Sequence, residues 1–186
     1  MKWPVFRRNE PQQEGERKTG RKGFGLLLNL LLIFAVLFAV HAWQTRDAVE
    51  GVAPDIRGHT LNGPRFELEN TRGKPVLVHF WATWCPICGL EEDAIDAIAE
   101  DHQVITIAIQ SGGADAVWRY MNKEGLRFPV INDEDGRLAR TYGVRGVPTT
   151  FILNPEGEIE FTEVGLSTGP VLRAKLWMAG SLLAGG

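Results

Sequence analysis

The longest apolar stretch of the chain lies near its N-terminus. Residues 23–45 contain no Asp, Glu, Lys or Arg, and residues 24–40 are almost wholly apolar. A helix needs about 20 apolar residues to span a bilayer, so the stretch predicts a transmembrane anchor over residues 23–45. A cleaved signal peptide is the alternative interpretation, because Val40-His41-Ala42 resembles a small-residue cleavage site.

Charge on either side of this stretch predicts its orientation. Residues 1–22 carry seven Lys or Arg against three Glu. A basic flank stays on the cytoplasmic side, so residues 1–22 are predicted to form a cytoplasmic tail and the rest of the chain to cross the membrane. The whole chain has a net charge of −3, which argues against nucleic acid as a partner.

After a short linker over residues 46–51, the pattern predicts one domain over residues 52–186. Asn62-Gly63 between alternating apolar residues predicts a β-hairpin over residues 60–68. Apolar runs and amphipathic periods then alternate, which is typical of a mixed α/β sheet with helices on both faces. The expected strands are 75–82, 104–109, 128–131, 149–153 and 158–164, and the expected helices are 91–99, 114–124, 137–142 and 170–183.

The only two cysteines, Cys85 and Cys88, stand three residues apart between an expected strand and an expected helix. Two sulfurs at this spacing can close a disulfide. A thiolate at a helix start faces unpaired backbone N–H groups, which lower its pKa and favour reaction near neutral pH. Two cysteines are too few for a disulfide scaffold, and the four histidines show no zinc-ligand spacing. The pair is therefore predicted to be redox-active.

Two motifs together resemble a known family. They are Phe80-Trp81-Ala82-Thr83-Trp84-Cys85-Pro86-Ile87-Cys88 and, later in the chain, Gly146-Val147-Pro148-Thr149. The chain resembles the thioredoxin-fold proteins and, more narrowly, the membrane-anchored TlpA/ResA-like group, closest to the suppressor-of-copper-sensitivity D type. The resemblance implies a thioredoxin fold with an N-terminal β-hairpin extension. It also implies a bacterial inner-membrane protein whose catalytic domain is periplasmic.

The resemblance also implies roles for individual residues. Cys85 would be the exposed nucleophile and Cys88 the buried resolving thiol. Trp84, Pro86, Val147 and Pro148 would form the substrate-binding surface, with Pro148 in the cis form.

Two further side chains bear on proton transfer. Glu91 lies three residues after Cys88 and could accept a proton from it, as an acid at this spacing does in the ResA-like reductases; a solvated acid at a helix start is the alternative. His79 departs from the family, because cytoplasmic thioredoxins have an acid at this position. We expect a hydrogen-bonded structural histidine, with a proton relay as the alternative.

The predicted function is that of a thiol–disulfide oxidoreductase, acting as a reductant. Its expected partners are oxidised protein substrates, a membrane dithiol electron donor and, through residues 23–45, the bilayer. No bound cofactor is expected beyond the Cys85–Cys88 disulfide. The alternatives are a disulfide oxidant or isomerase, a copper- or haem-handling thiolate protein and, least supported, a peroxidase of related fold.

Overall fold

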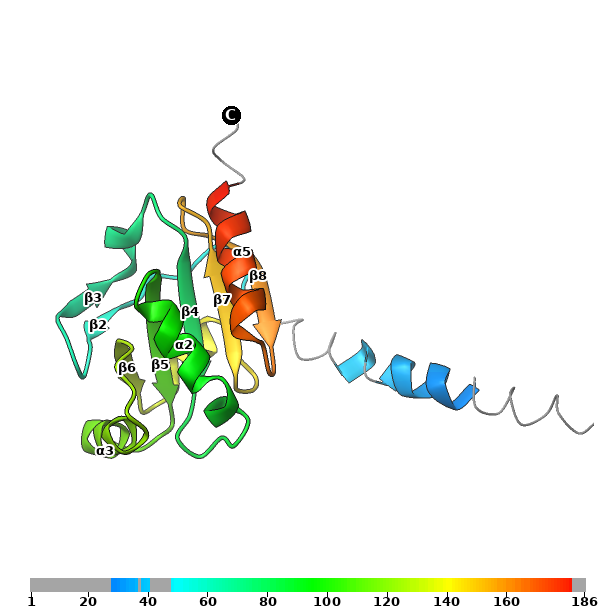
Figure 1. Ribbon diagram of the computed structural model, residues 1–186, viewed down its shortest axis with the longest axis horizontal. Coiled ribbons are helices and arrows are strands. Elements are labelled where there is room, and N and C mark those ends of the chain that lie inside the picture. The colour runs from blue at the N-terminus through cyan, green and yellow to red at the C-terminus, as the bar shows by residue number, and fades with distance from the viewer. Residues whose placement is uncertain (1–27, 37, 41–47, 182–186) are drawn as a thin grey trace, which may run out of the picture. The chain divides into compact units, whose positions relative to one another are not determined.

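The computed structural model describes residues 28–36, 38–40 and 48–181 (Figure 1). Residues 28–36 and 38–40 are helical. Within these described ranges, no helix is both long enough and apolar enough to cross a membrane. The expected tail over residues 1–22 lies outside the described residues, as does part of the expected anchor over residues 23–45.

The chain divides into two units, residues 1–39 and 40–186, and the second carries all the strands named below. In chain order its elements are β1 (Gly51–Val52), β2 (Arg57–His59), β3 (Arg65–Glu67), η1 (Leu68–Thr71), β4 (Val76–Trp81), η2 (Cys88–Leu90), α2 (Glu92–Ala99), β5 (Gln103–Ile109), α3 (Ala114–Glu124), β6 (Val130–Asp133), α4 (Arg137–Thr141), β7 (Thr149–Leu153), β8 (Glu158–Val164) and α5 (Gly169–Ser181).

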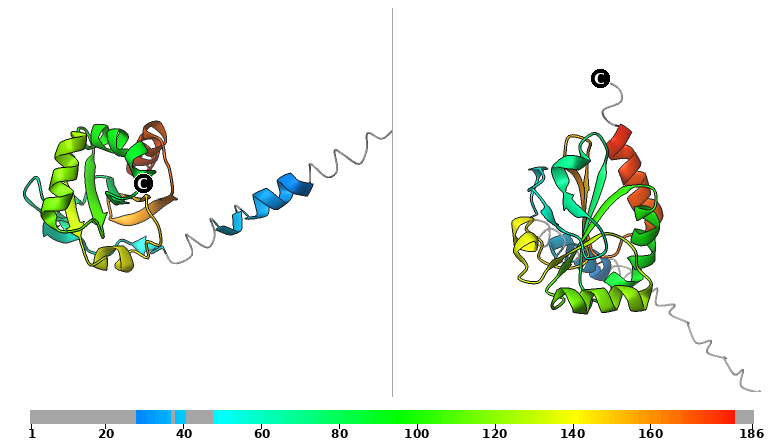
Figure 2. Two further views of the ribbon diagram at one scale, coloured as in Figure 1. Left: turned by 90° about the horizontal axis from the view of Figure 1, so that it is seen from below. Right: turned by 90° about the vertical axis from the view of Figure 1, so that its left-hand side faces the viewer.

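A mixed sheet in the order β1-β8-β7-β4-β5-β6 forms the centre of this unit. Strands β4, β5 and β6 are parallel, whereas β7 is antiparallel to β4 and β8 is antiparallel to β7. Helices α2 and α5 lie on one face and α4 on the other (Figure 2). The expected mixed sheet with helices on both faces is confirmed. A hairpin also forms around Asn62-Gly63, because β2 pairs with β3, but its first strand lies before the expected range of residues 60–68.

Strand β4 runs through the middle of the core, and all six of its residues are buried. Alternate side chains point to opposite faces. The Phe80 ring packs at 5.2 Å from Tyr142 and 5.8 Å from Phe151, whereas the Trp81 ring lies 5.6 Å from Tyr120. Because it is buried on both faces, the strand ends in a fixed position and presents the residues after Trp81 at the edge of the sheet.

Several expected boundaries differ from the structure. The strand expected at residue 128 begins at Val130, because Pro129 has no N–H for the sheet and the N–H of Phe128 bonds the Asp96 carboxylate at 2.7 Å. Gly51, the last residue of the expected linker, already begins β1. The final helix is described as far as Ser181, and its two remaining expected residues lie outside the described ranges.

Candidate active site

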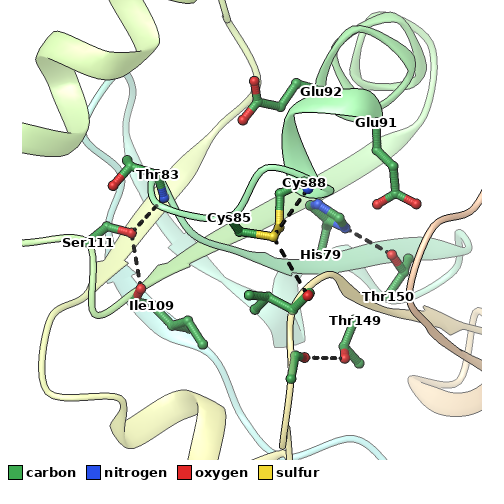
Figure 3. The surroundings of a disulfide bond; sticks show 12 residues. His79, Thr83, Cys85, Cys88, Glu91, Glu92, Ile109, Ser111, Thr149 and Thr150 are labelled. Atoms are coloured by element: carbon green, nitrogen blue, oxygen red, sulfur yellow. Dashed lines mark hydrogen bonds between the residues drawn. A yellow bond between two sulfur atoms is a disulfide. The ribbon is translucent and has the colours of Figure 1, made fainter. Parts of the chain in front are cut away.

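Cys85 and Cys88 form a disulfide beyond the C-terminal end of β4 (Figure 3). In open α/β sheets this edge is where binding sites gather. Ser111, which follows β5, holds the segment before the cysteines: its hydroxyl accepts the Thr83 N–H at 3.0 Å and donates to the Ile109 carbonyl at 3.0 Å. The loop carrying Cys85 is thus tied to the neighbouring parallel strand.

The prediction that the cysteines occupy the first turn of the following helix is wrong. The short helix η2 begins at Cys88, and α2 begins only at Glu92. The segment closes with i to i+3 bonds, such as Glu91 N–H to the Cys88 carbonyl at 2.9 Å, and Gly89 is a poor helix former. One expected contact is nevertheless present, because the Cys88 N–H donates to the Cys85 sulfur at 3.2 Å.

Both cysteines are buried in the disulfide form, but to different extents. Cys88 is fully buried, and Cys85 is 7% exposed, so the expectation of an exposed Cys85 is wrong for this state. Val147 covers Cys85, since its carbonyl oxygen lies 3.7 Å from the Cys85 sulfur. Cys85 is still the member of the pair that retains contact with solvent.

The residues expected to bind substrate surround Cys85. The Val147–Pro148 peptide bond is cis, as the resemblance predicts. Pro86 is exposed, and Trp84 is 59% exposed with its Nε1 donating to the Gln110 carbonyl at 3.0 Å. The indole therefore stands at the surface in a fixed orientation beside the disulfide.

Glu91 is buried rather than solvated. Its Oε1 accepts the Ser167 N–H, and its Oε2 has no hydrogen-bond partner. Burial raises the pKa of Glu91 to about 7, although the bond from Ser167 opposes the rise. Figure 3 shows Glu91 on the side of His79 and Thr150, whereas Glu92 points away from them. A carboxyl group with a pKa near neutrality can both accept and return a proton.

Glu92 is also buried, but it has a different partner. Its Oε1 accepts the hydroxyl hydrogen of Tyr120 at 2.8 Å, which joins α2 to α3. Burial raises the pKa of Glu92. Because its carboxylate serves a contact between helices, Glu92 is a structural group.

His79 lies within β4, buried and hydrogen-bonded. Its Nδ1 is 2.9 Å from the Thr150 hydroxyl on β7, its paired neighbour in the sheet. Burial lowers the pKa of His79 to about 3. The ring is therefore neutral at physiological pH, which agrees with the expected structural histidine.

Sequence reasoning missed the segment that holds Glu91. Gly165 N–H donates to the Pro148 carbonyl at 2.9 Å, and Ser167 N–H binds Glu91, so one loop contacts both sides of the site. No motif marks this loop, because it acts through backbone N–H groups. Gln110 and Ser111 were also missed, although their place directly after a parallel strand could have indicated them.

Within the ranges that the structure describes, no group of three or more His, Cys, Asp or Glu side chains is placed to hold a metal ion. Cys85 and Cys88 lie close together without a third ligand of these types.

Comparison with known proteins gives relatives over most of the chain. The thioredoxin-like protein of Haemophilus influenzae is 31% identical over 154 residues, covering 82% of this chain and 92% of that protein. The thiol-disulfide oxidoreductase ResA of Bacillus subtilis is 32% identical over 155 residues, covering 80% and 85%. The crystal structure of the exposed lipoprotein thioredoxin of Streptococcus pneumoniae is 29% identical with a TM-score of 0.59, covering 67% of this chain and 99% of that one.

The family assignment agrees with the fold and with the site. The profile of the AhpC/TSA family matches residues 49–162, which include the redox disulfide and the cis-proline. The chain therefore belongs to the AhpC/TSA family and is a protein disulfide oxidoreductase with a thioredoxin-like fold.

Proposed function

We propose that the chain reduces disulfides of extracytoplasmic proteins, with Cys85 as the attacking thiolate and Cys88 as the resolving thiol. The observation that carries this proposal is the asymmetry of the site. Cys85 retains contact with solvent beside the Val147 carbonyl, whereas Cys88 is fully buried behind it. A partner disulfide can reach the first sulfur only.

The exchange proceeds in two displacements. The Cys85 thiolate attacks one sulfur of the partner disulfide, and the other partner sulfur leaves as a thiolate. Cys88 then loses its proton and attacks the Cys85 sulfur, which releases the second partner thiolate. The partner gains two electrons, and the protein is left with the Cys85–Cys88 disulfide. A dithiol donor returns the pair to the reduced form.

Glu91 is the group we assign to the proton of Cys88. The unpartnered Oε2 of this buried carboxylate is available to accept a proton. Its pKa near 7 lies about 1.5 units below that of an ordinary thiol, so transfer of the proton is uphill by only about 2 kcal/mol. His79 is not given this role, because its low pKa makes it a poor proton acceptor.

The direction of electron flow and the location are parts of the same proposal. No charged residue lies between the cysteines to stabilise a thiolate strongly, as a potent oxidant requires. The apolar residues 23–45 would anchor the chain in a bacterial inner membrane, and one relative is titled an exposed lipoprotein. The electron donor would be a membrane dithiol protein. Substrates would be cysteine pairs of apocytochromes or of proteins oxidised under copper stress.

Trapping tests the exchange. In the Cys88→Ala protein, Cys85 should remain attached to its partner through a mixed disulfide, and non-reducing electrophoresis with mass spectrometry should identify the disulfide-linked protein. Cys85→Ala is the matched control and should trap none. If Cys88→Ala traps no protein and still supports full activity, the proposed mechanism is wrong.

The reduction potential tests the direction. Equilibration with redox buffers should give a value near that of thioredoxin, about −270 mV, and a value near about −120 mV would identify an oxidant instead.

A further inference from the structure

A groove opens beside the disulfide, between the Trp84 turn, α4 and the segment before the cis-proline. Its volume is about 190 Å³. We call it the arginine groove. The residues that the argument uses from its lining are Trp84, Gln110, Arg140, Arg145, Gly146 and Val147.

The groove adjoins Cys85 through two residues that line it, Val147 and Trp84. Val147 lines it and also places its carbonyl oxygen 3.7 Å from the Cys85 sulfur. Trp84, the residue directly before Cys85, forms the other wall. A polypeptide whose cysteine reacts at Cys85 would therefore place neighbouring side chains in this groove.

The wall formed by Trp84 is held by an unusual backbone conformation. Gln110, whose carbonyl accepts the indole N–H, has a φ of 46°. Residues other than glycine rarely adopt positive φ, and such conformations are concentrated at functional sites. This turn presents the carbonyl that holds the Trp84 indole at one wall of the groove.

The charge of the groove has one sign. Among the residues lining it, the only ionisable side chains are Arg140 and Arg145. Arg140 donates to the backbone carbonyl of Asp135 at 2.7 Å, a contact that leaves its positive charge unneutralised. The Asp133 carboxylate, on the preceding strand, instead accepts two backbone N–H groups at the start of α4.

We propose that the arginine groove binds an acidic side chain close to the reacting cysteine of the partner polypeptide, and so selects among substrates. The proposal rests on the exchange at Cys85 proposed above. A guanidinium group matches a carboxylate in geometry as well as in charge. The acids Glu134 and Asp135, which are exposed on the turn before α4, do not line the groove.

Three matched peptide disulfides test the proposal. They differ only in one residue near the cysteine, which is Asp, Asn or Lys, and their reduction by the full-length reduced protein is followed by stopped-flow fluorescence. At low salt the Asp peptide should be reduced about fivefold faster than the Lys peptide. The preference should shrink in about 0.5 M salt, because exposed charges are screened.

Two arginines on α4, one that lines the groove and one that does not, provide a test substitution and its control. Arg140→Gln should reduce the Asp-to-Lys rate ratio to about half or less, and Arg140→Glu should reduce it further. Arg137→Gln, on the same helix but lining a different cavity with Asp55 and Arg57, should leave the ratio unchanged. Equal rates for the three peptides, or a ratio that Arg140 does not alter, would overturn this inference alone. Failure to reduce even the Asn peptide would overturn the proposed exchange as well.

Discussion

Replacing Glu91 with Gln should change how stability depends on pH. The carboxyl group has a pKa of about 7 in the folded protein against an ordinary value of 4.5. Each pH unit of this difference corresponds to about 1.4 kcal/mol, so ionising the buried group costs the folded state about 3 kcal/mol. Gln keeps an oxygen for the Ser167 N–H but cannot ionise.

The direction of this pH dependence follows from the number of protons that the folded and unfolded states bind at Glu91. Between pH 4.5 and 7 the unfolded chain binds fewer protons at this group than the folded protein does, so folding stability falls as pH rises. Below pH 4.5 both states are protonated and the group contributes no slope. The Glu91→Gln protein should therefore gain stability over the wild type as pH rises from 5 to 8.

Urea unfolding of the oxidised protein at pH 5, 6, 7 and 8 measures this difference. We expect the free energy of unfolding of Glu91→Gln minus that of the wild type to rise by about 2–3 kcal/mol across the series. Asp93→Asn, an exposed acid of the next turn, controls for the loss of one negative charge. A difference that stays constant with pH would show that Glu91 does not titrate in this range, and would remove the basis for its role as a proton acceptor.

Three further substitutions follow from the contacts of the site. Thr150→Val should cost about 1–2 kcal/mol of unfolding free energy in urea, because it leaves the His79 ring without its partner, while Thr150→Ser should restore most of it. His79→Asn should flatten the loss of stability that the wild type shows as pH falls from 6.5 towards 4, since only the unfolded histidine gains a proton there; an unchanged acid slope would contradict the low pKa. Trp84→Ala should slow reduction of protein disulfides several-fold and change stability by less than about 1 kcal/mol, because the indole is mostly exposed and makes one bond to Gln110. Equal slowing with a small disulfide would indicate a damaged redox pair instead.

Local chemistry made much of the fold predictable. The Asn62-Gly63 signal gave the hairpin, and Gly125 ends α3 with a φ of 74°, where glycine is favoured. The short helix η2 before α2 was not predictable in the same way. Apolar periodicity cannot distinguish an α-helix from the i to i+3 turns that carry Cys88, since both place similar residues inward.

The residues of the site could be predicted where they belong to a sequence motif. They could not be predicted where they contact the site through backbone groups. Two sequence motifs indicated Cys85, Cys88 and Pro148 as residues of the site. Ser167 contributes only its N–H to Glu91, and any residue except proline has that group. Contacts of this kind depend on the path of the loop that follows β8. The spacing of residue types along the sequence does not indicate that path.

Burial of His79 lowers the folding stability in acid, and burial of Glu91 lowers it as the pH rises. His79 penalises the folded state below its ordinary pKa of 6.5, and Glu91 penalises it above its ordinary pKa of 4.5. Both side chains are neutral in the folded oxidised protein between these values, so the combined cost of these two groups to folding is smallest in mildly acidic solution. Near pH 7 the Glu91 carboxyl group is about half ionised, which is the condition under which it exchanges a proton most readily. In the proposed mechanism, the buried acid would therefore cost stability at the pH where it accepts the Cys88 proton, and the neutral His79 would take no part in that transfer.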